Sequence, residues 1–121
     1  MTHVLIVDDE PMLIEELQES LEFEDFKVSS AESVAAALTL CSNTSFDVVV
    51  TDLKMPNAGG LELIRELKAV DYPAAVIVVS GHGADSNRDQ ATKLGAVACF
   101  AKPLDVDDLI DEINQNLSIN E

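Results

Sequence analysis

The stretch VLIVDDEP, residues 4–11, joins a run of four apolar residues to three consecutive acidic residues. A short apolar run of this kind is typical of a buried strand. Unpaired carboxylates are costly to bury, so Asp8, Asp9 and Glu10 are expected where the strand reaches the surface. Pro11 suits the first turn of a helix, where its missing N–H is not needed. The stretch therefore predicts a buried strand, an acidic loop and a helix.

The rest of the chain repeats this strand–helix order four more times. Apolar runs predict strands at residues 3–8, 26–29, 47–51, 75–79 and 97–101. Apolar residues at helical spacing predict five helices. The first covers residues 11–24, the second runs from the Ser33 cap to Cys41, and the third lies around Leu61–Leu67. The fourth covers residues 85–94 with Gly95 as its C-cap, and the fifth runs from the Asp105 cap to Leu117. The helix over 85–94 has few apolar residues and should be weakly packed. Strands apolar on both faces and separated by helices predict an α/β doubly wound (βα)5 fold with a five-stranded parallel sheet.

Composition narrows the class of protein. The chain has 121 residues, one domain's worth, and a formal net charge of −16. This charge repels nucleic acid, so we expect no direct nucleic-acid binding by this chain and instead a basic partner or a bound cation. No stretch approaches the roughly 20 apolar residues that cross a bilayer, and no signal-peptide pattern is visible, so a cytoplasmic protein without membrane contact is expected. Cys41 and Cys99 are expected to be thiols in a reducing compartment.

Polar residues follow the predicted strands at the points where the strands end. All strands of a parallel sheet end at one edge, and ligands bind there where the strand order changes direction. If the strands of the sheet lie in the order 2-1-3-4-5, the first and third strands are neighbours where the order changes direction. The carboxylates at their ends would then lie within about 4–6 Å of one another and disfavour one another's ionisation. Mg²⁺ prefers such oxygen ligands, and no His/Cys cluster suggests zinc. The edge residues are Asp8, Asp9, Asp52, Ser80, Gly81, Lys102 and Pro103.

Each edge residue also has a simpler interpretation. Asp8 or Asp9 could cap the following helix. For one residue of the pair, this interpretation is as well supported as metal binding. Asp52 could merely open a turn, and Ser80 and Lys102, taken singly, would be an ordinary loop hydroxyl and a solvated lysine. Their joint placement favours a site in which a carboxylate beside Mg²⁺ attacks phosphorus while a lysine and a hydroxyl offset the phosphoryl charge.

Together these residues give the chain a resemblance to the receiver domain of two-component response regulators, a CheY-like, flavodoxin-like fold. The resemblance covers His3 to about Leu117. It rests on four motifs in order, each at the end of a predicted strand: VLIVDDEP, VVVTDLKMPNAGG, VIVVSGHG and GAVACFAKPL. The resemblance implies that residues 1–121 form one receiver domain.

The resemblance implies a role for each acidic residue. Asp52 is similar to the family's phosphoacceptor, and Asp8 and Asp9 to the acidic pair that holds Mg²⁺, with Mn²⁺ as a possible substitute. Asp52 and the backbone carbonyl of Lys54 would be further metal ligands. The implied function is transfer of a phosphoryl group from phosphohistidine to Asp52, by a sensor histidine kinase or a histidine phosphotransfer protein.

The remaining site residues follow from the third and fourth motifs. The resemblance implies that Ser80 hydrogen-bonds a phosphoryl oxygen, that Lys102 pairs with another, and that Gly81 leaves the site open to the donor. It also implies a cis bond between Lys102 and Pro103. His82, in the loop after Ser80, is expected to be a solvated histidine that could touch a ligand.

One position departs from the family pattern. Relatives carry Tyr or Phe three residues before the lysine, as a switch on the output face, whereas here Cys99 stands in that place. Phe100 follows it and should point to the opposite face, because side chains alternate along a strand. The Ser80 half of the switch remains, so Ser80 and Cys99 are the candidate switch residues.

The expected output is a change in partner binding or homodimerisation through the face formed by the fourth helix, the fifth strand and the last helix. The chain would then be a signalling switch and not an enzyme, catalysing only its own phosphorylation and dephosphorylation. The effector domain or downstream protein is not identified by the sequence. An alternative is a phosphorylation-independent receiver-like interaction module.

Two other classes fit the sequence less well. A flavin-binding protein would need a phosphate loop rich in Ser, Thr and Gly after the first strand, where this chain has DDEP. A phosphatase of the haloacid-dehalogenase type would have a D-x-D pattern at that place, and the pattern is absent.

Overall fold

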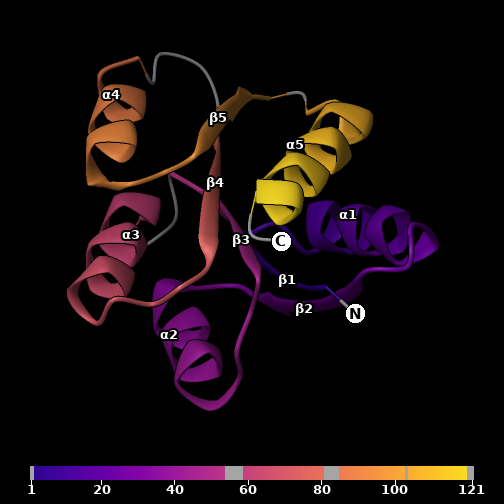
Figure 1. Ribbon diagram of the computed structural model, residues 1–121, viewed down its shortest axis with the longest axis horizontal. Helices are drawn as coiled ribbons and strands as arrows, with labels where there is room; N and C mark the ends of the chain where they lie inside the picture. The colour runs from indigo at the N-terminus through magenta and orange to yellow at the C-terminus, as the bar shows by residue number, and fades with distance from the viewer. Residues whose placement is uncertain (1, 54–58, 81–84, 103, 120–121) are drawn as a thin grey trace.

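The computed structural model describes residues 2–53, 59–80, 85–102 and 104–119 (Figure 1). Strands and helices alternate along the chain, as the sequence predicts. The strands are β1 (His3–Val7), β2 (Lys27–Ala31), β3 (Val48–Asp52), β4 (Ala75–Ser80) and β5 (Ala98–Ala101). The helices are α1 (Pro11–Phe23), α2 (Val34–Asn43), α3 (Gly60–Ala69), α4 (Asp85–Leu94) and α5 (Val106–Ile119).

The strands form one parallel sheet in the order β2-β1-β3-β4-β5. The predicted doubly wound fold and strand order are therefore confirmed. Because β1 pairs with both β2 and β3, the order changes direction beside β1. This places the carboxyl ends of β1 and β3 next to one another, where open α/β sheets bind ligands.

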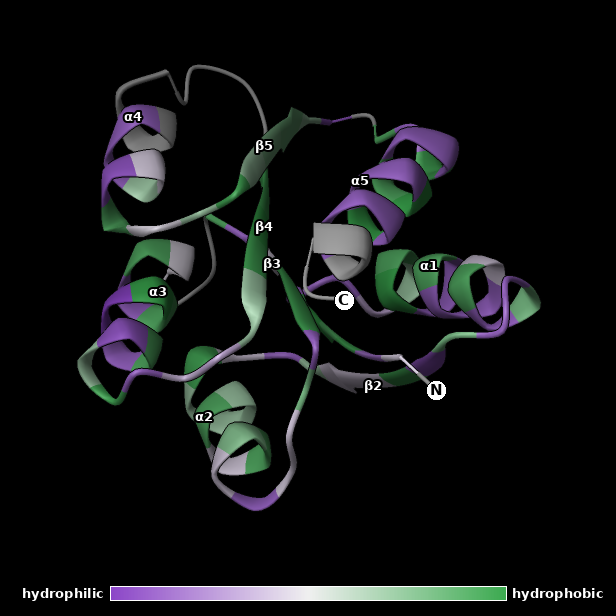
Figure 2. Cartoon of the chain, in the orientation of Figure 1, coloured by the Kyte–Doolittle hydropathy of each residue, from purple (hydrophilic) through white to green (hydrophobic). Residues whose placement is uncertain are grey.

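Helices cover both faces of the sheet, so the molecule has three layers (Figure 1). One apolar core lies between the sheet and α1 and α5, and the other between the sheet and α2, α3 and α4. The central strands alternate between these cores: Val48 and Val50 face the first, and Val49 the second. Figure 2 shows the largely hydrophobic strands β3 and β4 enclosed by helices, of which α1, α3, α4 and α5 carry hydrophilic residues and α2 is mostly hydrophobic. This enclosure explains why the central strands are apolar on both faces.

Three predicted helix caps are present. The Ser33 hydroxyl accepts a hydrogen bond from Ala36 N–H, and the Asp105 carboxylate accepts one from Asp107 N–H. Gly95 follows α4 with a φ of +119°, a conformation that a side chain would disfavour. These local signals fix where α2 and α5 begin and where α4 ends.

One strand boundary and one helix cap differ from the prediction. The second strand is Lys27–Ala31 instead of 26–29, and Phe26 is a buried residue that precedes it. In α1 the buried side chains include Ile14, whereas Leu13 is only partly buried. Neither Asp8 nor Asp9 caps α1, since Glu10 is its N-cap residue.

The fourth helix is thinly packed, as predicted. Among its described side chains, residues 89–94, Ala91 is buried, Leu94 is partly buried and the others are exposed. The described part of this helix therefore buries little apolar area, which indicates that it is weakly held against the sheet. No helix in the described ranges is both long and apolar enough to span a bilayer.

At the amino end of the sheet, Tyr72 connects two loops. Its hydroxyl donates a hydrogen bond to the Thr44 carbonyl at 2.7 Å and accepts one from Phe46 N–H at 2.8 Å. The hydroxyl therefore satisfies a backbone donor and a backbone acceptor of the segment that leads into β3.

His3 lies at the same end of the sheet. Its backbone N–H donates to the Asp47 carboxylate, and its Nε2 lies 2.8 Å from the Ser29 hydroxyl. The ring packs edge-on against Phe46, with a centroid distance of 4.4 Å. Burial, followed by the nearby Lys27 charge, lowers the pKa of His3 despite the opposing effect of Asp47. The sequence did not reveal these contacts.

Candidate functional site

The carboxyl end of the sheet carries buried polar side chains from several strands. Asp8 follows β1 directly, Asp52 is the last residue of β3, and Ser80 is the last residue of β4. Their residue exposures are 3%, 6% and 0%. Lys102 follows β5 and is partly buried. The parallel topology therefore brings together residues separated by up to 94 positions, as predicted from the strand ends.

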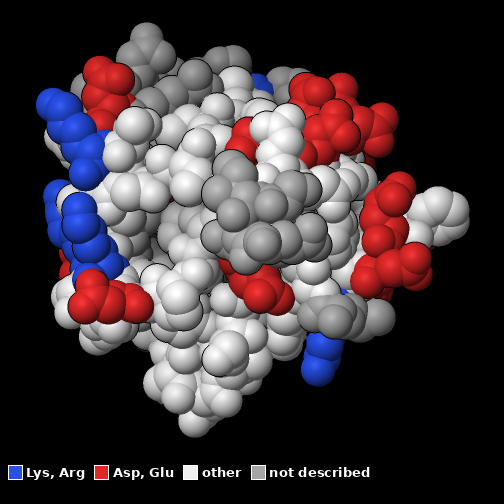
Figure 3. Space-filling view, viewed as in Figure 1, with Lys and Arg blue, Asp and Glu red and all other residues white. Residues whose placement is uncertain are grey.

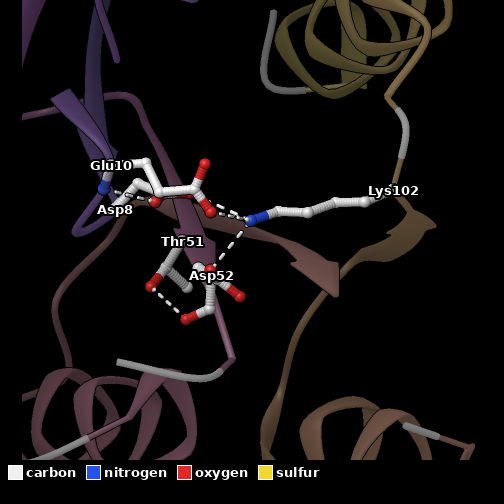
Figure 4. A network of polar contacts seen from close by, with 5 residues as sticks. All are labelled: Asp8, Glu10, Thr51, Asp52 and Lys102. Atoms are coloured by element: carbon white, nitrogen blue, oxygen red, sulfur yellow. Dashed lines mark hydrogen bonds and ion pairs between the residues drawn. The ribbon is translucent and has the colours of Figure 1, made fainter. Parts of the chain in front are cut away.

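Lys102 is the centre of the network drawn in Figure 4. Its Nζ donates to Asp52 Oδ2 at 2.9 Å and to Asp8 Oδ2 at 3.4 Å. The same nitrogen lies 3.7 Å from Glu10 Oε1. One ammonium group thus contacts carboxylates that come from the ends of two neighbouring strands. Glu10 was not singled out as a site residue by the sequence, although it stands in the acidic run.

The network shifts the pKa of two of its members. Burial raises the pKa of Asp8, and the Asp52 charge adds to this, while the Glu10 N–H and Lys102 act in the opposite direction. Burial also opposes the charged form of Lys102, but the hydrogen bond and charge of Asp52, with Asp8 and Glu10, outweigh it and raise the pKa of Lys102. The surroundings therefore favour the charged form of Lys102 and disfavour the ionised form of Asp8.

The acidic run is compatible with a divalent cation. Asp8, Asp9 and Glu10 each offer a carboxylate oxygen, and these oxygens lie within 4.8 Å of one another. Asp8 is buried, whereas Asp9 and Glu10 are exposed, so the cluster opens to solvent. An all-oxygen donor set suits a hard cation that keeps several waters, such as Mg²⁺.

Two glycines bring α3 close to the end of β3. A Cβ on Gly60 would lie 2.3 Å from the Asp52 carbonyl oxygen, and one on Gly59 would lie 2.4 Å from the Leu53 carbonyl oxygen. Side chains at these positions would push the backbone away from the site. The sequence indicated a turn here but not this close approach.

A cavity of about 230 Å³ extends from the site into the molecule. Its polar rim includes Asp8, Glu10, Asp52 and Lys102, and its apolar wall includes Leu13, Leu17, Leu104 and Val106 from the α1 and α5 side. The Asp52 carboxylate therefore lies beside open space at the carboxyl end of the sheet.

Cys99 and Phe100 lie on opposite faces of β5, as the strand alternation predicts. Cys99 packs against the core of α2, α3 and α4, and its Sγ lies 3.9 Å from the Thr92 hydroxyl of α4. Phe100 packs against the core of α1 and α5. Cys41 and Cys99 are both thiols, as expected.

Other predicted positions lie outside the described residues. These are the Lys54 carbonyl, Gly81, His82 and the bond between Lys102 and Pro103.

Comparison with known proteins identifies the family of the chain. A family model, the response regulator receiver domain, matches residues 4–114. The chain belongs to this family. The receiver is 39% identical over 111 residues to a response regulator receiver protein of Anaeromyxobacter sp. (strain Fw109-5). This match covers 92% of this chain and 47% of that protein. It is 34% identical over 115 residues to the transcriptional regulatory protein GlrR of Escherichia coli (strain K12), covering 95% of this chain and 26% of GlrR.

The solved structures give the same result for the fold. The receiver matches the crystal structure of a response regulator receiver domain protein from Clostridium thermocellum with a TM-score of 0.94 and 33% identity. The match covers 99% of this chain and 97% of that chain. By contrast, the receiver spans about half the length of the Anaeromyxobacter protein, at 47%, and about a quarter of GlrR, at 26%.

Charge is distributed unevenly over the receiver. The charged residues of α1 and α5 are all acidic, whereas α3 and α4 contain Arg65, Lys68, Arg88 and Lys93. In the view of Figure 3, basic side chains lie beside acidic ones on the side of α3 and α4, whereas acidic side chains predominate on the side of α1 and α5.

Proposed function

We propose that this receiver domain, residues 1–121, takes a phosphoryl group onto Asp52 from a phosphohistidine of a sensor histidine kinase or histidine phosphotransfer protein. The observation that carries the proposal is the contact of the buried Asp52 carboxylate with Lys102 beside Asp8, in a chain of the receiver family. The uneven charge favours a donor whose docking surface is basic.

The transfer exchanges one bond to phosphorus for another. An Asp52 carboxylate oxygen attacks the phosphorus, the new O–P bond forms, and the P–N bond to the donor imidazole breaks. The imidazole leaves with the electron pair of that bond and takes a proton from water. Lys102 then pairs with a phosphoryl oxygen, and the Ser80 hydroxyl donates to another, so both offset the charge that Asp52 acquires.

Asp8 and Asp9 would hold the divalent cation, together with Asp52 and the Lys54 carbonyl. Mg²⁺, or Mn²⁺ in its place, would supply positive charge to the phosphoryl oxygens when bound. The fit rests on the oxygens of the acidic run, which lie within 4.8 Å of one another. Gly81 and Pro103 keep the roles that the resemblance implies, an open approach and a cis bond. His82, in the loop after Ser80, is proposed as a solvated histidine that is able to touch a ligand.

The output surface is proposed to be the face of α4, β5 and α5. Movement of Ser80 toward the phosphoryl group would displace the segment that leads to α4, which is thinly packed and can shift at low cost. Cys99 contacts Thr92 of α4 and stands at the switch position in place of an aromatic residue. The change would alter homodimerisation or binding of an effector domain or downstream protein. The receiver acts as a cytoplasmic switch and catalyses only its own phosphorylation and dephosphorylation.

Acetyl phosphate with Mg²⁺ tests the proposal without the cognate kinase. Intact-protein mass spectrometry should show one added phosphoryl group, which is lost in Asp52→Asn and absent when EDTA replaces Mg²⁺. Asp111→Asn, on the exposed side of α5, is the matched control and should be labelled normally. Labelling that persists in Asp52→Asn rejects Asp52 as the acceptor. Failure to label the parent protein would favour a phosphorylation-independent interaction module.

A further inference from the structure

Glu10 occupies an unusual place at the start of α1. It is the N-cap residue, with an extended backbone at φ −103° and ψ 104°. Ser, Thr, Asp and Asn are preferred at such positions because their short side chains can accept hydrogen bonds from the first turn. The Glu10 side chain makes no such cap. Helix capping by its carboxylate therefore does not account for a glutamate at this position.

The backbone of Glu10 is fixed on both sides. Its N–H donates to Asp8 Oδ1 at 2.9 Å, and its carbonyl accepts from Ile14 N–H at 3.1 Å. These bonds hold the residue between the buried Asp8 and the first turn of α1. The side chain then extends back over the edge of the sheet, where Oε1 lies 3.7 Å from Lys102 Nζ (Figure 4).

The charges at this edge are unbalanced. Asp8, Asp9, Glu10 and Asp52 provide four carboxylates, and Lys102 is the cation that contacts three of them in the described part of the chain. The Glu10 side chain is 65% exposed, against 4% for Asp8, so Glu10 forms the outer wall of the cluster. A carboxylate in this place attracts a cation entering from solvent. It also interacts with Lys102, whose Nζ lies 3.7 Å from Glu10 Oε1 and 2.9 Å from Asp52 Oδ2.

We propose that Glu10 is a positioning residue of the receiver site, which contacts Lys102 at the outer side of the cluster and adds a third acidic group to the carboxylates that bind the divalent cation. This inference deepens the proposed function and rests on the cation binding at Asp8 and Asp9. It needs no direct bond between Glu10 and the ion, because a carboxylate about 5 Å away still contributes by charge.

The test is the Mg²⁺ affinity of the isolated receiver, measured by isothermal titration calorimetry. Glu10→Gln keeps the size of the side chain and removes its charge. We expect about three- to tenfold weaker Mg²⁺ binding in low salt, and a smaller difference when monovalent salt is raised. Glu19→Gln removes the same charge from an exposed position of α1 and should change the affinity less than twofold. Glu10→Asp should recover part of the loss.

A second readout separates charge from folding. Without metal, Glu10→Gln should melt at or above the temperature of the parent protein, since one repulsive charge has gone, while the rise in Tm produced by Mg²⁺ should be smaller. Equal Mg²⁺ affinities for Glu10→Gln and Glu19→Gln would overturn the role of Glu10. If the parent protein does not bind Mg²⁺ at all, cation binding at Asp8 and Asp9 fails instead, so the two failures are distinguishable.

Discussion

The amino end of the sheet pairs partly buried polar groups with one another, whereas the carboxyl end gathers charges that are not matched. At the amino end, the Tyr72 hydroxyl bonds one backbone donor and one backbone acceptor. At the carboxyl end, Lys102 is shared by Asp8, Glu10 and Asp52. The first arrangement is complete within the fold. The second leaves excess negative charge, which lowers stability and gives the edge an affinity for cations.

The comparison separates two kinds of buried polar residue. Polar groups that serve the fold should contribute the same stability whether or not a cation is present. Polar groups that serve the site should have effects that depend on the cation, because it changes the charge balance around them. Measuring the free energy of unfolding with EDTA and with Mg²⁺ therefore distinguishes the two ends of the sheet.

Replacement of Lys102 should have the largest effect. Lys102→Met leaves the buried Asp8 and Asp52 carboxylates without their shared ammonium. In urea unfolding with EDTA, we expect the free energy of unfolding to fall by about 2–3 kcal/mol. This is less than the roughly 3–5 kcal/mol for a broken buried ion pair, because 24% of the Lys102 side chain is exposed. Mg²⁺ should stabilise the variant more than the parent protein, because the cluster becomes more negative. The control is Lys68→Met on the exposed end of α3, and an equal loss in both variants would contradict the prediction.

Removal of the Tyr72 hydroxyl should have the next largest effect. Tyr72→Phe leaves the Phe46 N–H and the Thr44 carbonyl without their partner. We expect the free energy of unfolding to fall by about 1–2 kcal/mol, since each neutral hydrogen bond contributes roughly 0.5–1.5 kcal/mol. The loss should be the same in EDTA and in Mg²⁺. A penalty that changes with Mg²⁺ would show that the two ends of the sheet are coupled and would break the comparison.

The sequence predicted the fold because its signals are local. The caps at Ser33 and Asp105 and the apolar runs of β3 and β4 each act within a few residues, and the structure confirms them. The boundary of β2 was wrong because it lies at the edge of the sheet. Ser29 and Ser30 join the strand through backbone pairing with β1, which leaves no apolar pattern in the sequence.

The candidate site was predictable only in part. The position of Asp8, Asp52, Ser80 and Lys102 at one edge follows from parallel topology, which the alternating pattern indicates. The contact of Glu10 with Lys102 does not follow, because it depends on the direction of one side chain across the edge. The Tyr72 contacts were also missed, since they join residues 26 and 28 positions apart without any periodic pattern.

Neutralising Asp8 should have the smallest effect on stability and the opposite sign. Burial raises the pKa of Asp8, so its folded pKa lies above its unfolded value and the ionised form costs stability at neutral pH. Stability from this group is present at low pH and is lost as pH rises through the folded pKa. Asp8→Asn keeps an oxygen for the Glu10 N–H, and Lys102 keeps Asp52 and Glu10 as partners.

In EDTA at pH 7, Asp8→Asn should therefore unfold with a free energy up to about 1 kcal/mol higher than that of the parent protein. The gain should shrink as pH falls, because Asp8 of the parent becomes protonated as well. With Mg²⁺ the order should reverse, since the variant has lost a carboxylate of the cation cluster. Urea unfolding across this pH range, with and without Mg²⁺, measures all three effects. A variant less stable than the parent in EDTA would mean that Asp8 serves the fold as Tyr72 does, and the contrast between the two ends of the sheet would not hold.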